Sequence, residues 1–161
     1  MPYALGAVRN HVRVAAETIG PKFGITSIIG VALRPNESDH PTGLALDFMT
    51  KDKAKGDALA EHAKTNASAY GVKYVIWWGR IWSVERNAEG WRAYKPPTGS
   101  TTDTAMHKDH VHVSFFATPG TGVPTQNETG SGSGISCGIL LIAAASSVSG
   151  FAYALNRLIG G

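Results

Sequence analysis

The segment HVHVSFF at residues 110–116 constrains the fold most, because polar and apolar residues alternate along it. Successive side chains of a β-strand point to opposite faces of its sheet, so this alternation predicts a strand. His110 and His112 would then project together from one face, while Val111 and Val113 would face the core. We therefore expect the two histidines to lie side by side on one face of a sheet.

A second segment, SDHPTGLALD at residues 38–47, places a carboxylate in apolar surroundings. Its first half is polar and turn-like, and its second half has the character of a buried strand. Asp47 lies between Leu46 and Phe48. Burial of a charge is costly unless a hydrogen-bond partner or a metal compensates for it. The segment therefore indicates that Asp47 has such a partner.

Apolar periodicity predicts the remaining elements. Helices are expected at residues 5–19 and 52–69, where apolar residues recur with helical spacing. Strands are expected at residues 25–33, 43–48, 72–78, 81–84 and 110–116. A two-residue turn at Gly79-Arg80 would join the third and fourth strands, and residues 85–108 would form a long loop. Together these elements predict an α+β fold with a small, largely antiparallel sheet and flanking helices.

The composition changes after Ala117 and divides the chain of 161 residues. Residues 1–117 are long enough to form one domain with its own core. Residues 118–134 are rich in Gly, Ser, Thr and Pro, which predicts a flexible linker. No charge occurs in residues 135–155, so residues 135–159 are expected to form a transmembrane helix or, alternatively, an apolar helix that packs on a partner.

Charge, cysteine content and the N-terminus exclude several classes of protein. The net charge of +3 comes without a stripe of Lys and Arg, so a nucleic-acid partner is not expected. The single cysteine, Cys137, cannot form an internal disulfide, which excludes a disulfide-stapled scaffold. The N-terminus lacks a basic start followed by an unbroken apolar core, so no signal peptide is expected.

His40, Asp47 and His112 can supply the three protein ligands of a zinc site. A catalytic zinc ion usually keeps its fourth position for water. The turn after His40 would bring the first two ligands around one ion, and the third would come from a distant strand packed beside the first. Metal-assisted hydrolysis also needs a proton acceptor, and Asp109, three residues before His112, is the candidate.

The two segments together resemble a known family. The pattern S-x-H-x-x-G-x-A-x-D at residues 38–47, followed by D-x-x-H at residues 109–112, is similar to the zinc D-alanyl-D-alanine peptidases of the M15 group, which includes VanY-type and endolysin-like peptidases. Residues 3–117 resemble a bacterial and phage branch of that group. The resemblance implies the M15 or hedgehog-like zinc peptidase fold and zinc-dependent hydrolysis of peptidoglycan stem peptides. The enzyme would be a D,D-carboxypeptidase or an endolysin-type endopeptidase.

The resemblance also implies site residues, partners and location. The implied residues are the zinc ligands His40, Asp47 and His112, the general base Asp109, the oxyanion-stabilising His110, the substrate-binding Arg34 and His107, and Ser38 as the hydrogen-bond partner that fixes the ligand loop. The expected partner is a peptidoglycan peptide, bound by a monomer. The protein would work at the cell wall or the periplasmic face of a membrane, or be delivered by a phage. Its apolar helix would provide membrane contact or an anchor.

Two other functions stay open at this point. The first is a zinc-binding but catalytically silent module that binds the cell wall and is tethered by its C-terminal tail. The second is a lysis protein whose apolar tail acts on the membrane. Asp109 argues against the first, because a silent relative has no reason to keep a base.

Overall fold

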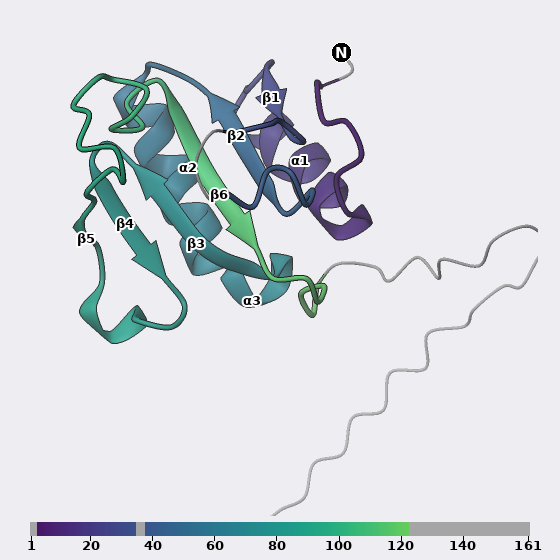
Figure 1. Ribbon diagram of the computed structural model, residues 1–161. Helices are drawn as coiled ribbons and strands as arrows, with labels where there is room; N and C mark the ends of the chain where they lie inside the picture. Colours follow the sequence, from purple (N-terminus) through teal and green to yellow (C-terminus); the bar gives the residue numbers. More distant parts are fainter. Residues whose placement is uncertain (1–2, 35–37, 123–161) are drawn as a thin grey trace, which may run out of the picture. The chain divides into compact units, whose positions relative to one another are not determined.

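The computed structural model describes residues 3–34 and 38–122. Six antiparallel strands form one sheet in the order β1-β2-β6-β3-β4-β5 (Figure 1). The strands are β1 (Ile28–Ile29), β2 (Ala45–Met49), β3 (Val72–Trp77), β4 (Arg80–Ser83), β5 (Arg92–Ala93) and β6 (His110–Phe115). The helices are α1 (Asn10–Lys22), α2 (Lys53–Thr65), α3 (Ala67–Tyr70) and the short 3-10 helix η1 (Asn87–Glu89). The expected α+β class, a small antiparallel sheet with helices beside it, is therefore confirmed.

Strand β6 comes last in the described chain but lies in the middle of the sheet, between β2 and β3 (Figure 1). Its His112 pairs with Asp47 of β2 on one side and with Ile76 of β3 on the other. This register brings the two segments HVHVSFF and SDHPTGLALD next to each other. The central position of β6 is thus what joins the two halves of the predicted site.

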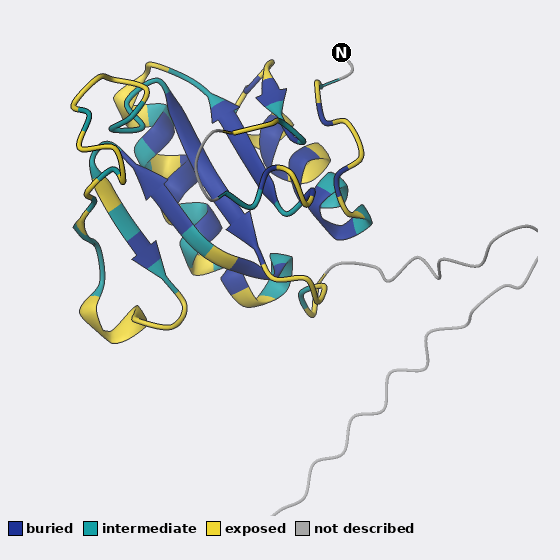
Figure 2. Cartoon of the chain, viewed as in Figure 1, coloured by how far each residue is buried: buried dark blue, intermediate teal, exposed yellow. Residues whose placement is uncertain are grey.

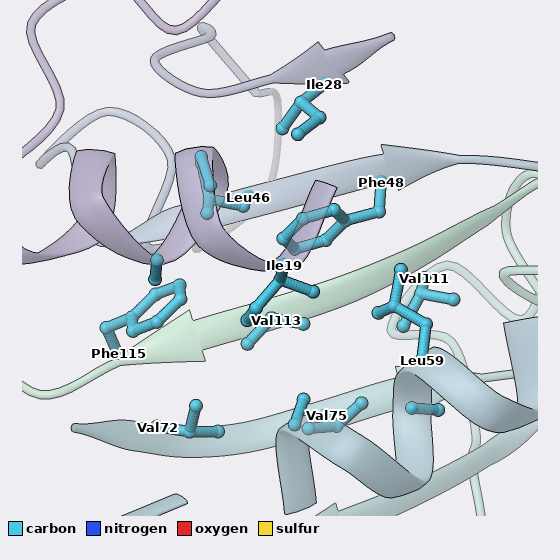
Figure 3. Packing of buried hydrophobic residues seen from close by; sticks show 14 of the residues in the cluster. Ile19, Ile28, Leu46, Phe48, Leu59, Val72, Val75, Val111, Val113 and Phe115 are labelled. Atoms are coloured by element: carbon cyan, nitrogen blue, oxygen red, sulfur yellow. The ribbon is translucent and has the colours of Figure 1, made fainter. Parts of the chain in front are cut away.

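The alternation along the strands separates a core face from a site face. Leu46, Phe48, Val111 and Val113 are fully buried in the main hydrophobic cluster, together with Ile19 of α1 (Figure 3). Burying one such side chain contributes about 1.5–3 kcal/mol. The residues between them on β2 and β6 line a cleft instead. Figure 2 shows β6 buried along its length and β2 buried except at its end, and helices cover one face of these strands.

The N-terminal elements differ from the expectation. The strand expected at residues 25–33 is reduced to β1, because the backbone N–H groups of Gly30 and Val31 donate to the carbonyls of Ala4 and Leu5. A Cβ on Gly30 would lie 2.2 Å from the carbonyl oxygen of Leu5, so this close approach needs glycine. These bonds direct the chain toward the N-terminal segment and away from the sheet.

Both predicted helices are present with changed boundaries. Helix α1 begins at Asn10, not at residue 5, and continues through Pro21 in its last turn. The region expected as one helix at residues 52–69 is divided into α2 and α3 at Asn66. The side chain of Asp52 accepts a hydrogen bond from the N–H of Lys55 and caps the start of α2. Gly71 follows α3 with a φ of 73°, the left-handed conformation that commonly ends a helix.

The turn between β3 and β4 lies one residue earlier than expected. Trp77 pairs with Arg80, so the two turn residues are Trp78 and Gly79, with φ angles of 50° and 70°. Positive φ at both positions is typical of the tight turns that suit the twist of a hairpin. The N–H groups of Trp78 and Gly79 donate to the carbonyls of His107 and Met106. The turn therefore holds the loop that leads into β6.

Residues 123–161 lie outside the described residues, and with them most of the predicted linker and the apolar helix expected at residues 135–159. Within the described ranges, no helix is both long and apolar enough to cross a membrane.

Candidate metal centre and its cleft

The structure brings His40, Asp47 and His112 together in the interior. All three are buried, and one potential ligand atom of each lies within 4.8 Å of the others. Oδ1 of Asp47 is 2.9 Å from Nδ1 of His112 and 3.1 Å from Nε2 of His40. The cluster therefore offers two imidazoles and one carboxylate that could hold a metal ion.

Backbone geometry positions the ligands from two separate segments. Asp47 and His112 are directly opposite each other on β2 and β6. His40 is brought to them by a turn in which the N–H of Gly43 donates to the carbonyl of His40 at 3.0 Å. Gly43 has a φ of 72°, and a Cβ there would lie 2.7 Å from the carbonyl oxygen of Ala7, so the turn needs glycine. The N–H of His40 itself donates to Oγ of Ser38 at 3.2 Å.

The His40 ring has the orientation of a metal ligand. Its Nδ1 is 2.5 Å from the carbonyl oxygen of Gly30, which can only accept, so Nδ1 carries the proton. In the neutral ring, Nε2 then holds a lone pair that faces Oδ1 of Asp47. Among the described residues this buried Nε2 has no hydrogen-bond partner, although Oδ1 is close. Two lone pairs that face each other fit a cation bound between them.

Electrostatics favour the ligand form of Asp47 and of His112. Burial opposes ionisation of Asp47, but its contacts with His112 and His40 and the charges of the nearby histidines outweigh burial and hold its pKa far below the usual range. Burial lowers the pKa of His112 despite the attraction of Asp47. At neutral pH Asp47 is therefore a carboxylate beside the neutral imidazole of His112, which is the protonation state that metal binding requires.

Arg34, expected to bind substrate, contacts the centre directly. Its Nη2 lies 2.5 Å from Oδ2 of Asp47, the oxygen that does not face the histidines. The Arg34 side chain is 36% exposed and lines the cleft, whereas Asp47 is almost fully buried. In this structure the guanidinium is thus engaged with a ligand carboxylate.

Asp109, expected to be the base, lies behind His110. Its Oδ1 is 2.6 Å from Nδ1 of His110, and its Oδ2 accepts a hydrogen bond from Oγ1 of Thr104 at 2.6 Å. Burial raises the pKa of Asp109, but these two bonds, the charge of His110 and a backbone hydrogen bond together lower it below its usual value. His110 lines the cleft, and its Nε2 is 3.6 Å from Oδ1 of Asp47. The group that faces the centre is therefore His110, and Asp109 contacts Nδ1, the ring nitrogen on the side away from the centre.

The centre opens into a cleft of about 230 Å³. Tyr94 and the consecutive prolines Pro96 and Pro97 form part of its wall. His107 lines the cleft as expected, with its ring centroid 4.7 Å from that of His110 and 5.1 Å from that of Tyr94. His107 has a φ of 52°, an unusual value for a residue other than glycine. Burial, followed by repulsion from the neighbouring histidines, lowers its pKa to about 3.

Three residues of the site were not expected from the sequence. The ring of Tyr74 stacks on that of His112 at 5.5 Å, Tyr94 contacts His107, and Thr104 binds Asp109. The alternation of β3 could have placed Tyr74 on the site face beside Ile76. Tyr94 and Thr104 lie in the long loop, where no periodicity indicates which side chains turn inward.

A second, larger groove of about 720 Å³ is lined by apolar residues such as Trp82, Val84 and Phe116. Its lining contains no histidine or carboxylate. The smaller cleft is therefore the candidate active site, because it gathers the groups that can bind a metal and move protons.

Comparison with known families supplies one match. Residues 4–107 match the family described as VldE, C-terminal domain, and this stretch contains Arg34, His40 and Asp47 but ends before Asp109 and His112. No curated protein matches the chain significantly, and neither does any solved structure. Because the match spans well over half of the 161 residues, the chain belongs to the VldE C-terminal domain family.

Proposed function

We propose that the protein is a zinc-dependent peptidase of the M15 type that hydrolyses peptidoglycan stem peptides. The observation that carries this proposal is the buried group of His40, Asp47 and His112 beside an open cleft. Two histidines and one carboxylate are a donor set found in catalytic zinc sites, which leave one position for water. Other divalent metals accept the same donors, so zinc itself belongs to the proposal.

Zinc in such a site supplies Lewis acidity and a water of lowered pKa. The chain would supply the proton transfer. In a neutral His110, Nδ1–H would donate a hydrogen bond to Oδ1 of Asp109, and the Nε2 lone pair would be directed toward the centre. The pair would take a proton at Nε2 from the attacking water and return it to the leaving amine. Asp109 acts in this scheme through His110, since its own oxygens bind Thr104 and His110.

The cleft wall would bind the peptide. Tyr94, Pro96 and Pro97 offer apolar surface beside the centre, and Tyr74 covers the ring of His112. A stem peptide could lie along this wall with its scissile carbonyl at the metal. The protein would act as a monomer at the cell wall or the periplasmic side of a membrane, or after phage delivery, with residues 135–159 as its membrane contact.

Digestion of purified sacculi, with the muropeptides identified by mass spectrometry, tests this function. Loss of a terminal D-alanine would identify a carboxypeptidase, and cut cross-links would identify an endopeptidase. EDTA should abolish either product and zinc should restore it. Asp47→Asn should be inactive, whereas Asp103→Asn, an exposed carboxylate in the same loop as Thr104, should keep full activity. Unchanged sacculi after treatment with zinc-loaded protein would contradict the proposal.

One observation favours a second candidate, a silent zinc-binding module that binds the cell wall. Nε2 of His110 is near enough to Oδ1 of Asp47, at 3.6 Å, to become a fourth protein ligand. Four protein ligands are typical of structural zinc sites. This candidate predicts that zinc-loaded protein sediments with sacculi and releases no muropeptide.

A further inference from the structure

We infer that Arg34 is a positioning residue for the metal centre: it occupies one oxygen of Asp47 and leaves the other for the metal. This role differs from the substrate-binding role that the family resemblance implies. The inference rests on the metal centre of the proposed function, but it does not depend on which bond is cleaved or on whether any is.

The two oxygens of Asp47 face different partners. Oδ1 faces the histidines, with His112 Nδ1 at 2.9 Å, His40 Nε2 at 3.1 Å and His110 Nε2 at 3.6 Å. Oδ2 faces Arg34 Nη2 at 2.5 Å. A guanidinium bound to Oδ2 leaves only Oδ1 directed at the ligand cluster. The carboxylate would therefore bind the metal through one oxygen.

Burial and charge make this contact strong. The Asp47 side chain is only 4% exposed, so its charge depends on neighbouring groups rather than on water. Arg34 is the one Lys or Arg that lines the cleft within the described ranges. A hydrogen bond between two charged groups is about twice as strong as one between neutral groups. Arg34 thus stabilises the ligand carboxylate and fixes its rotation.

A substrate-binding arginine would direct its guanidinium donors mainly at the peptide in the cleft. Here Nη2 of Arg34 donates a hydrogen bond to Oδ2 of Asp47, so this end of the guanidinium is directed at the metal centre. The two roles predict different measurements. A positioning residue changes metal affinity in the absence of substrate, whereas a substrate-binding residue changes KM and leaves metal affinity alone.

Metal titration of the full chain separates the two roles. Metal-free Arg34→Gln, Arg34→Lys and unsubstituted protein are titrated with Zn²⁺ against a chromophoric chelator, and with Co²⁺ for its absorption spectrum. Loss of a residue that orients a ligand typically lowers metal affinity 10- to 100-fold. We expect that loss for Arg34→Gln, with a changed Co²⁺ spectrum, and a smaller loss for Arg34→Lys. Arg86→Gln breaks an exposed pair with Glu89 and is the matched control, expected to bind like the unsubstituted protein.

Zinc affinity of Arg34→Gln within twofold of the unsubstituted protein would overturn the inference, whatever happens to KM. Circular dichroism in EDTA shows whether Arg34→Gln folds. If it does not fold, the zinc affinity of Arg34→Lys is the test instead. Zinc binding without peptide cleavage would remove the proposed function and leave this inference standing. Failure of the unsubstituted protein to bind either metal would remove both.

Discussion

Asp47 and His112 are 65 residues apart in the chain, yet Oδ1 of one lies 2.9 Å from Nδ1 of the other across β2 and β6. His40 approaches the same oxygen from a turn that precedes β2. A metal bound by all three would join two neighbouring strands and the turn. Metal binding and folding stability should therefore be coupled in this protein.

Zinc should raise the melting temperature of the full chain, because an ion that binds only the folded state stabilises it by mass action. Free zinc at 100 times its Kd contributes about 2.7 kcal/mol. Scanning calorimetry with zinc and with EDTA measures the difference. Asp47→Asn should melt at the same temperature in both, while the exposed Asp103→Asn should keep the full shift. Equal melting temperatures for the unsubstituted protein would mean that no ion binds the folded state.

The metal-free protein should lose stability as the pH falls below 6.5. His107 has an ordinary pKa of 6.5 when unfolded, and its folded pKa is about 3. Between these values the unfolded chain binds a proton that the folded protein does not, which costs about 1.4 kcal/mol per pH unit. The loss is complete below the folded pKa. His112 acts in the same direction, because its pKa is also lowered.

Urea unfolding at several pH values between 4.5 and 6.5 measures this dependence. His107→Asn should reduce the slope of the unfolding free energy against pH by the contribution of one proton. Asparagine suits the positive φ at this position. Asp47 does not contribute within this window, because its folded and unfolded pKa values both lie below it. An unchanged slope in His107→Asn would show that His107 has the same pKa in the folded and the unfolded protein.

Asp109→Asn should lower kcat by a factor of about 10²–10⁴ and retain zinc, because it replaces the charged acceptor beside Nδ1 of His110 with a neutral amide. Thr104→Val removes one hydrogen bond to the same carboxylate and should have a smaller effect. Turnover of muropeptides and zinc titration are measured on the same samples, with Asp103→Asn as control. Full turnover by Asp109→Asn would exclude the proposed proton route.

Gly56→Ala should destabilise the domain, although alanine normally favours a helix by about 1 kcal/mol over glycine. A Cβ at this position in α2 would lie 2.1 Å from Cζ2 of Trp77. That ring cannot withdraw easily, because its Nε1 donates to Oδ1 of Asp57 at 2.9 Å. Overpacking of this kind costs about 1–3 kcal/mol, which urea unfolding would detect.

The exposed Ala58 on the same helix supplies the matched substitution. Ala58→Gly should cost about 1 kcal/mol from helix propensity alone. A Gly56→Ala protein that is more stable than the unsubstituted one would show that α2 can move away from the sheet.

Periodicity was sufficient to predict the site face of the sheet. The alternation around His112 predicted which side chains of β6 face the core, and the polar turn after His40 indicated that His40 and Asp47 approach each other. The contact of Arg34 with Asp47 could not be predicted, because it depends on the path of the loop between β1 and β2. The same holds for Thr104 beside Asp109, since residues 85–108 lack a repeating pattern.

The strand expected at residues 25–33 shows a different limit. Its β-branched residues are equally suited to a long strand and to the short β1 with a turn toward the N-terminus. The choice is made by hydrogen bonds from Gly30 and Val31 to Ala4 and Leu5, which are tertiary contacts. Local sequence cannot encode such a choice.

The central place of β6 has a consequence for synthesis of the protein. A nascent chain that stops before residue 110 lacks the strand between β2 and β3, so it holds two incomplete sheet fragments with unpaired edges. His112 of that strand pairs with Asp47 of β2 on one side and Ile76 of β3 on the other. Termination before residue 112 therefore removes one of the three potential metal ligands together with the strand that joins β2 to β3.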